Sequence, residues 1–256
     1  MLDGSRTPLV LVHGGAHGAW CWQPMLPHLR RRALAIDLPP TAIRGVTADV
    51  APPPEVRTTG LREFADAVLT ATDQAGLARF ALVGHSMGGL TIAEVARRAP
   101  ERVTGLAFVS CLVPPEGGTV VDALPAAVRE MTREAMTRAR DEGTFGPGMD
   151  EDLKRQMFCN DMDEEQTRFV LERCGHECVA AFLDTVIRTG IPPELPKTYV
   201  RLLRDQALDP PTQDEQIANL RASPGGDVTV VELDSGHDAM VSRPRELAAL
   251  LNTIAP

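Results

Sequence analysis

Short apolar runs alternate with amphipathic segments along most of the chain. The apolar runs lack polar alternation, which is typical of strands that are covered on both faces of a sheet. They lie at 8–12, 33–37, 79–84, 103–110, 198–203 and 228–233. The helix candidates between them lie at 60–76, 87–98, 212–222 and 243–253. This alternation predicts an α/β fold, with a mostly parallel sheet of about six strands flanked by helices.

Two stretches interrupt this rhythm. Residues 39–58 are rich in proline and carry no period, so we expect a long functional loop over the carboxyl edge of the sheet. Residues 112–196 carry helical patterns without a convincing strand, at 125–141, 150–157, 163–173 and 176–189. We therefore predict a core formed by 1–111 and 197–256, with a helical cap, 112–196, inserted after the fourth strand.

Composition limits the classes of function. With 256 residues and 43% hydrophobic content, the chain is large enough for one domain with a real core. The balance of 26 basic and 35 acidic residues gives a net charge of −9, and the basic residues are scattered. A nucleic-acid or anionic-membrane partner is therefore not expected. The N-terminal apolar run is too short to span a bilayer and resembles no export signal, so we expect a soluble cytoplasmic protein, monomeric or homodimeric.

The cysteines do not indicate a disulfide framework. They are odd in number, and no export signal precedes them. Their positions are Cys21, Cys111, Cys159, Cys174 and Cys178. The stretch "CGHEC" at 174–178 offers two thiols and an imidazole, but no second ligand cluster completes a tetrahedral site. We therefore expect reduced thiols, a helix at this stretch and no metal.

The stretch "VGHSMGGL" at 83–90 places a candidate nucleophile, Ser86, between an apolar strand and a helix that begins near Met87. A G-x-S-x-G pentapeptide alone also fits an ordinary serine in a glycine-rich turn. On so sharp a strand-to-helix turn, however, Gly84, Gly88 and Gly89 have to lack side chains, and the hydroxyl is held above the sheet. The unsatisfied N–H of Met87 at the helix start then favours developing negative charge.

A second oxyanion donor is expected in "VHGGAHG" at 12–18, directly after the first strand. Gly14 and Gly15 let the backbone approach closely, and we assign the N–H of Gly15 as the partner of Met87. We interpret His13 as a hydrogen-bonded structural residue, since imidazoles near turns are usually satisfied.

A serine needs a base, and His237 in "LDSGHDAM" follows the last strand, with Gly236 letting its ring reach across the carboxyl edge. The other histidines are less suitable: His85 lies on the elbow itself, His28 in a helix, His17 beside the glycine loop and His176 in the insertion.

Three aspartates are candidates for the acid that orients this base. Asp205 follows the fifth strand by two residues, and we assign it the role. Asp209 is the second choice, because an aspartate before two prolines has a sufficient task as a helix N-cap. Asp234 is too close in sequence to His237 to approach its Nδ1 well. The order Ser86, Asp205, His237 is the one that a nucleophile elbow requires.

Four segments, "LVLVHGGAHGAWCWQPMLPHL", "LVGHSMGGL", "RLLRDQALDPPTQDEQIANL" and "LDSGHDAM", resemble the α/β-hydrolase superfamily, in the branch of plant methylesterases, hydroxynitrile lyases and related bacterial esterases. "MFCND" at 157–161 is also similar to that branch. The resemblance covers nearly the whole chain and is weakest at 39–58 and through much of the insertion. It implies the α/β-hydrolase fold, the Ser86–His237–Asp205 triad, and an oxyanion hole formed by the N–H groups of Gly15 and Met87.

Two departures favour ester hydrolysis over cyanohydrin cleavage. Lyases of this branch have a threonine in the first loop and a lysine after the catalytic histidine, and here these positions are Gly14 and Asp238. A carboxylate would repel a leaving anion. If Asp238 faces the pocket, it raises the pKa of His237 and disfavours anionic substrates; the alternative is that it points to solvent.

We therefore expect a serine esterase that cleaves a small-molecule carboxylic ester through an acyl-enzyme, with no cofactor. The candidate pocket residues are Gly14, Trp20, Cys111, Leu112, Phe182 and Asp238, with core packing as the alternative for the apolar ones. Because aromatic residues are few, the pocket should be mainly aliphatic. Two other functions stay open: a cofactor-free lyase, thioesterase, lactonase or C–C hydrolase with the same triad, and a non-catalytic ligand-binding protein on this fold.

Overall fold

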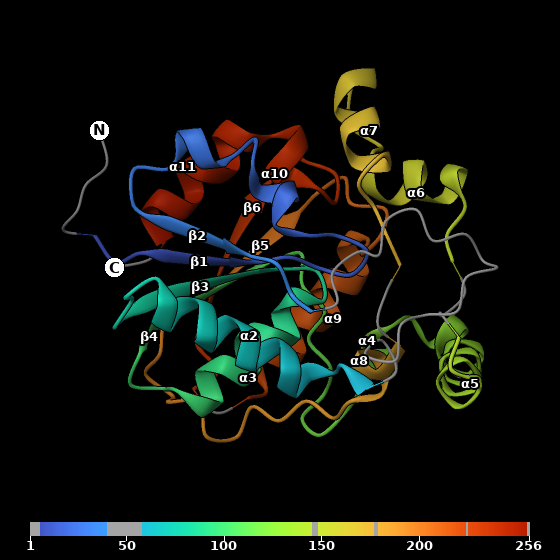
Figure 1. Ribbon diagram of the computed structural model, residues 1–256, viewed down its shortest axis with the longest axis horizontal. Helices are drawn as coiled ribbons and strands as arrows, with labels where there is room; N and C mark the ends of the chain where they lie inside the picture. The colour runs from blue at the N-terminus through green and yellow to red at the C-terminus, as the bar shows by residue number, and fades with distance from the viewer. Residues whose placement is uncertain (1–5, 40–57, 145–147, 177–178, 224, 255–256) are drawn as a thin grey trace.

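A computed structural model describes residues 6–39, 58–144, 148–176, 179–223 and 225–254 of the chain (Figure 1). Its centre is one six-stranded parallel sheet in the order β2-β1-β3-β4-β5-β6. The strands are β1 (Leu9–Val12), β2 (Ala33–Ile36), β3 (Phe80–His85), β4 (Val103–Val109), β5 (Lys197–Leu202) and β6 (Val228–Leu233). This confirms the six predicted strands, each within about two residues of its expected ends.

The central strands β1, β3 and β4 are buried on both sides because helices cover both faces of the sheet. In β1, Val10 and Val12 belong to one buried cluster, whereas Leu9 and Leu11 belong to the other. Side chains alternate between the faces of a strand, so a continuous apolar run supplies both cores at once.

One face of the sheet carries α2 (Leu61–Gln74), α3 (Gly88–Arg98) and α9 (Pro210–Arg221). The opposite face carries the short 3₁₀ helices η1 (Ala19–Trp22) and η2 (Leu26–His28), together with α10 (Ala239–Ser242) and α11 (Pro244–Ile254). Figure 1 shows α2 and α3 below the sheet and α10 and α11 above it. The fold is therefore the three-layer arrangement that the alternating pattern predicts.

The described residues between β4 and β5 form five helices: α4 (Val120–Ala123), α5 (Ala126–Glu142), α6 (Glu151–Phe158), α7 (Glu164–Leu171) and α8 (Val179–Leu183). They lie beyond one end of the sheet in Figure 1. A third apolar cluster joins Met136 and Phe182 of these helices to Leu61 and Leu90 of the sheet-covering helices. The helical insertion is thus observed, and its treatment as a separate cap domain with bounds 112–196 stays a prediction.

The helix expected at 176–189 is much shorter in the described residues. It ends at Leu183, because the following backbone pairs with a loop instead of continuing the helix. Val186 and the loop at 117–118 exchange backbone hydrogen bonds, and Glu116 accepts from the backbone N–H of Arg188. The proline-rich loop expected at 39–58 lies almost entirely outside the described residues.

No helix in the described segments is both long and apolar enough to cross a membrane. The cysteines within those segments, Cys21, Cys111, Cys159 and Cys174, form no disulfide with one another. The residues of "CGHEC" that can be described, 174–176, are not helical, which corrects the helix expected there.

Candidate active site

Ser86 occupies a strained turn between β3 and α3. Its backbone φ is +52°, a value that non-glycine residues rarely adopt outside sites where the surrounding structure imposes it. The Ser86 N–H donates to the carbonyl of Val109 at 3.1 Å, and the Ser86 carbonyl accepts from the N–H of Gly89 at 3.1 Å. Both neighbouring elements therefore hold the turn, while Ser86 itself stays partly accessible.

The glycines around Ser86 are required by close contacts. A Cβ atom at Gly84 would lie 2.8 Å from the Gly88 carbonyl carbon, and one at Gly88 would lie 2.5 Å from the carbonyl oxygen of Val12. A Cβ atom at Gly89 would lie 2.6 Å from the Cβ of Cys111. No side chain fits at these distances, which confirms the expectation drawn from the motif.

The loop after β1 passes directly beside the serine. A Cβ atom at Gly14 would lie 2.6 Å from the Cβ of Ser86 and 3.0 Å from the carbonyl oxygen of His85. Gly15 is partly accessible and lines the same cavity as Ser86 and Met87. The two residues assigned as oxyanion donors thus border one space together with the serine.

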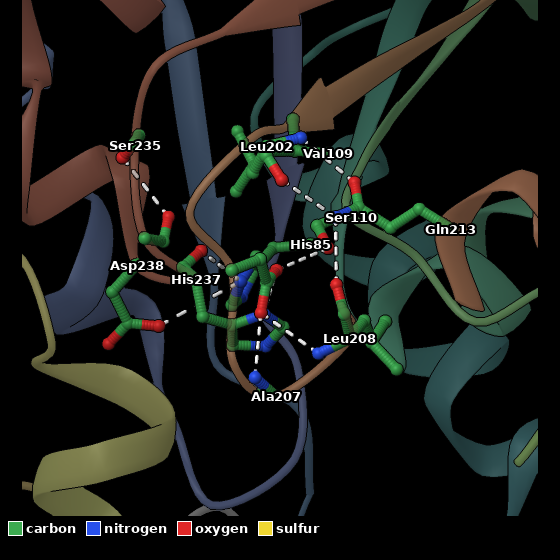
Figure 2. Close-up of polar contacts among 12 residues, drawn as sticks. His85, Val109, Ser110, Leu202, Ala207, Leu208, Gln213, Ser235, His237 and Asp238 are labelled. Atoms are coloured by element: carbon green, nitrogen blue, oxygen red, sulfur yellow. Dashed lines mark hydrogen bonds and ion pairs between the residues drawn. The ribbon is translucent and has the colours of Figure 1, made fainter. Parts of the chain in front are cut away.

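His237 and Asp205 are in contact. His237 Nδ1 lies 2.7 Å from Asp205 Oδ2, and both side chains are buried. Asp205 Oδ1 accepts hydrogen bonds of 2.8 Å from the backbone N–H groups of Ala207 and Leu208 (Figure 2). These donors hold the Asp205 carboxylate in one orientation, in which it can accept the Nδ1 proton of His237 and orient its ring.

A further contact, missed by the motif search, involves Ser110. Its Oγ donates to Asp205 Oδ2 at 2.6 Å. Ser110 is fully buried, follows β4 directly and has a φ of +41°. The available signal was positional, because β4 and β5 are neighbours and residues after their carboxyl ends meet.

The two alternative acids have other roles. Asp209 caps α9, accepting from the N–H of Thr212 at 3.0 Å, as expected from the two prolines that follow it. Asp234 is exposed and pairs with the guanidinium of Arg204 at 2.7 Å. Of the three aspartates, Asp205 is the one whose carboxylate contacts His237 among the described residues.

Two further histidines are buried and neutral. His13 Nδ1 donates to the carbonyl of Gly14 at 2.8 Å, and its Nε2 accepts from the N–H of Leu38 at 3.1 Å. Burial lowers the pKa of His13 to about 4. Burial likewise lowers the pKa of His85 well below its ordinary value, while His85 Nε2 donates to the carbonyl of His237 at 3.1 Å. The structural role expected for His13 fits this arrangement.

The observed orientation of the Asp238 side chain differs from both orientations considered from the sequence. It neither points to solvent nor lines the cavity, because its side chain is 0% exposed and its Oδ2 lies 2.8 Å from Nε2 of His17. The attraction between a buried carboxylate and an imidazole 221 residues away in sequence explains the orientation.

His85, His237 and Asp238 offer donor atoms within 4.8 Å of one another. Two of these residues are already engaged, since His85 Nε2 donates to a backbone carbonyl and His237 Nδ1 contacts Asp205. Zinc binds nitrogen at about 2.0–2.1 Å, so the donor atoms of a tetrahedral zinc site lie closer to one another than the 4.8 Å over which these donors are spread. The cluster is better described as a packed polar network beside Ser86.

A cavity of about 380 Å³ opens at Ser86 and His237. Most of its side chains are aliphatic or thioether, as the composition suggested, and Cys174 and His176 of the insertion also border it. The apolar lining residues are Met87, Leu112, Leu124, Met136, Met149, Met157, Phe158, Val179, Phe182, Ala207 and Leu208.

Of the candidate pocket residues, Leu112 and Phe182 line the cavity. Three others do not. Gly14 is covered by Ser86 and His85, Trp20 stacks on His17 with ring centroids 5.2 Å apart, and the Cys111 thiol donates to the carbonyl of Gly84 at 3.1 Å. These three belong to the packing beneath the site.

Comparisons with known proteins agree with this geometry. The family model described as "Alpha/beta hydrolase family" matches residues 9–250. A probable esterase, PIR7A, of Oryza sativa subsp. indica is 29% identical over 100% of this chain and 98% of its own length. A carbendazim-hydrolyzing esterase of Nocardioides sp. (strain SG-4G) is 27% identical over 94% of this chain and 97% of its own.

Solved structures share the fold. An extracellular alpha/beta-hydrolase from a Paenibacillus species superposes with a TM-score of 0.76 at 21% identity, over 97% of this chain and 99% of that one. That hydrolase is described as sharing structural and functional homology with tobacco salicylic acid binding protein 2. With a family match along nearly its whole length, an elbow serine and a buried acid–histidine contact, the chain belongs to the alpha/beta hydrolase family and is an α/β-fold hydrolase.

Proposed function

We propose that the protein is a serine esterase that hydrolyses a small carboxylic ester through an acyl-enzyme on Ser86. The observation that carries this proposal is the 2.7 Å contact between His237 Nδ1 and Asp205 Oδ2 beside the cavity that Ser86 lines. A serine hydroxyl is a weak nucleophile at neutral pH, and an oriented imidazole is the group that activates it. The esterase names of full-length relatives support the ester as the bond that is cleaved.

In the first half of the reaction, Ser86 Oγ attacks the ester carbonyl carbon while His237 Nε2 takes the hydroxyl proton. The carbonyl oxygen becomes an oxyanion, which the N–H groups of Gly15 and Met87 stabilise. Collapse of this intermediate breaks the bond to the leaving oxygen, and His237 returns its proton to the departing alcohol.

In the second half, water attacks the acyl carbonyl of Ser86 and gives a proton to His237. The tetrahedral intermediate collapses to the free carboxylic acid, and Ser86 regains its proton. Asp205 keeps the proton of His237 on Nδ1 throughout, so that Nε2 faces the reacting atoms. No step needs a metal or an organic cofactor.

The cavity limits the substrate to a small, largely apolar ester. A volume of about 380 Å³ lies near the lower end of ordinary small-molecule sites. Four methionines (Met87, Met136, Met149 and Met157) and two phenylalanines (Phe158 and Phe182) border it, and thioether side chains adapt to irregular ligands. The position that carries a lysine in the related lyases is Asp238, which is turned away toward His17, so no cation stands there to receive a leaving cyanide.

The test is hydrolysis of p-nitrophenyl esters from acetate to octanoate by the wild type and by Ser86→Ala. We expect Ser86-dependent turnover with an optimum at short acyl chains. Turnover of thioesters, lactones or C–C substrates without simple esters would instead support a different bond for the same triad. Tight binding of an apolar ester with no turnover would support the ligand-binding alternative.

A further inference from the structure

A second buried acid–histidine contact lies behind the first. His17 Nε2 is 2.8 Å from Asp238 Oδ2, and His17 Nδ1 is 2.6 Å from the carbonyl oxygen of Gly15. The two side chains are 1% and 0% exposed. Neither residue touches the cavity, and the reaction described above uses neither of them.

The two contacts of His17 fix a proton count. A backbone carbonyl oxygen only accepts, so the contact with Gly15 requires a proton on Nδ1. The contact with Asp238 requires a proton on Nε2 or on the carboxyl oxygen. An imidazolium that faces a carboxylate satisfies both contacts at once, because Nδ1 then donates to Gly15 and Nε2 donates to Asp238. The pair is neutral as a unit, and this makes its complete burial tolerable.

Asp238 has no ordinary local task that explains its side chain. It stands at the N-cap position of α10, yet its carboxylate makes no cap hydrogen bond. Its Oδ1 has no hydrogen-bond partner among the described residues and lies 3.8 Å from Nε2 of His85. In Figure 2 this carboxylate lies beside His85 and His237, within the network around the proposed base. The contact with His17 is therefore the main interaction that holds this side chain.

The pair joins the two loops on which the proposed chemistry depends. Through the Gly15 carbonyl, His17 restrains the backbone of the residue whose N–H is the proposed oxyanion donor. Through its contact with Asp238, which directly follows His237, His17 is also linked to the loop that carries the proposed base. Phe158 of α6 packs against both histidines, edge-on to His17 at 5.0 Å and stacked on His237 at 5.7 Å between ring centroids.

We propose that His17 and Asp238 form a positioning pair, joined by a shared proton, that holds the loop carrying Gly15 in a fixed position relative to His237. The inference rests on the proposed function, because it assigns the pair a role in that same reaction. A positioning role changes the stabilisation of the transition state more than the binding of the substrate, since the oxyanion forms only after Ser86 has attacked.

Asp238→Asn, Asp238→Ala and Asp209→Asn provide the kinetic test. Asparagine at 238 can donate to Nε2 while Nδ1 still donates to Gly15, so it keeps the link and removes the extra proton; alanine removes the link. For Asp238→Ala we expect kcat to fall by about tenfold to hundredfold, with KM within about threefold, and for Asp238→Asn a smaller fall in kcat. Asp209→Asn makes the same chemical change at a helix cap and should leave both constants near wild type.

Nuclear magnetic resonance of ¹⁵N-histidine-labelled protein provides the second readout, which does not depend on turnover. At pH 7.5 we expect His17 to be protonated on both nitrogens in the wild type and on one nitrogen in Asp238→Asn. A His17 without a proton on Nδ1 in the wild type would overturn the pair, because the contact with the Gly15 carbonyl needs that proton. An unchanged kcat in a folded Asp238→Ala would overturn its role, and if that variant does not fold, an Asp238→Asn kcat equal to that of Asp209→Asn would do so. A wild type inactive on all esters would instead count against the proposed function, while the resonance result would still decide whether the pair exists.

Discussion

Ser110 Oγ donates a 2.6 Å hydrogen bond to the same oxygen of Asp205 that His237 Nδ1 contacts at 2.7 Å. The backbone N–H groups of Ala207 and Leu208 hold the other oxygen. The orientation of Asp205 is therefore set by the end of β4 as well as by its own loop. A carboxylate fixed in this way keeps the imidazole in one tautomer and one orientation.

Ser110→Ala removes one of these donors and leaves the others in place. We predict that kcat falls by about threefold to tenfold with little change in KM, because a buried hydrogen bond to a charged group contributes about 1.5–3 kcal/mol and only part of it bears on the reaction. Ser223→Ala is the matched control, since Ser223 accepts from Arg188 Nε at 2.6 Å away from the cavity. Equal kcat values in the wild type and in Ser110→Ala would show that Ser110 does not contribute to the reaction.

Asp205→Asn tests the assignment of the acid. We predict a loss of kcat of about 10⁴, because an amide in place of the carboxylate stabilises the wrong tautomer of His237. Asp209→Ala should instead lower the free energy of unfolding by about 1 kcal/mol through loss of the α9 cap, with kcat nearly unchanged. Steady-state kinetics and urea unfolding of both variants distinguish these results, and the reverse pattern would transfer the role to Asp209.

Lys154 predicts a preference among ester substrates. Within the described part of the cavity wall it is the one lysine or arginine, and no aspartate or glutamate accompanies it. Esters with a carboxylate distant from the scissile bond, such as mono-p-nitrophenyl esters of dicarboxylic acids, should therefore have a higher kcat/KM than neutral esters of equal length. An attraction of about 1 kcal/mol across a partly solvated cavity corresponds to roughly fivefold.

Lys154→Gln should abolish this preference and leave the neutral esters unaffected. Arg155→Gln is the control with the same change in net charge, because Arg155 pairs with Glu151 at 3.2 Å and is not among the lining residues. If the two variants lose the preference equally, the effect comes from overall charge and not from a contact with Lys154.

His13 predicts how stability depends on pH. Its pKa in the folded protein is about 4, below the ordinary 6.5, so between these values the unfolded chain binds a proton that the folded protein does not. The contribution of His13 to the free energy of unfolding is therefore fully present above about pH 6.5 and is lost as the pH falls toward 4. This contribution amounts to about 3 kcal/mol in total.

Urea unfolding at several pH values between 7.5 and 4.5 measures this slope. His13→Gln should be less stable at pH 7.5 and should show a shallower dependence on pH, because the titrating imidazole is gone. His28→Gln, on the half-buried η2, controls for the loss of one imidazole elsewhere. If the unfolding free energy of His13→Gln depends on pH as steeply as that of the wild type, His13 is not the group responsible for this dependence.

The sequence was informative where a local pattern has one structural solution. The elbow around Ser86 is one case, because Gly84 meets the backbone of the same turn, whereas Gly88 and Gly89 meet the ends of the two neighbouring strands, β1 and β4. The pairing of Asp205 with His237 is another, because both follow neighbouring parallel strands whose carboxyl ends meet.

The remaining features depend on contacts between distant segments. Asp238 had two expected orientations, and both were wrong because its partner, His17, is 221 residues away and carries no motif that links them. Trp20 and Cys111 were expected in the pocket but lie in packed layers beneath it. Most of the cavity wall comes from the helical insertion, whose order along the chain does not indicate which side chains face Ser86.

If Ser86 is the nucleophile that forms the acyl-enzyme, a p-nitrophenyl phosphonate should label it covalently, and intact-mass analysis of the treated protein detects this label. We expect one phosphonyl group per chain, located on the peptide that contains Ser86, with release of one equivalent of p-nitrophenol. Ser86→Ala should remain unlabelled under the same conditions. A folded wild type that stays unlabelled, or a Ser86→Ala protein that is labelled to the same extent, would show that Ser86 is not the nucleophile.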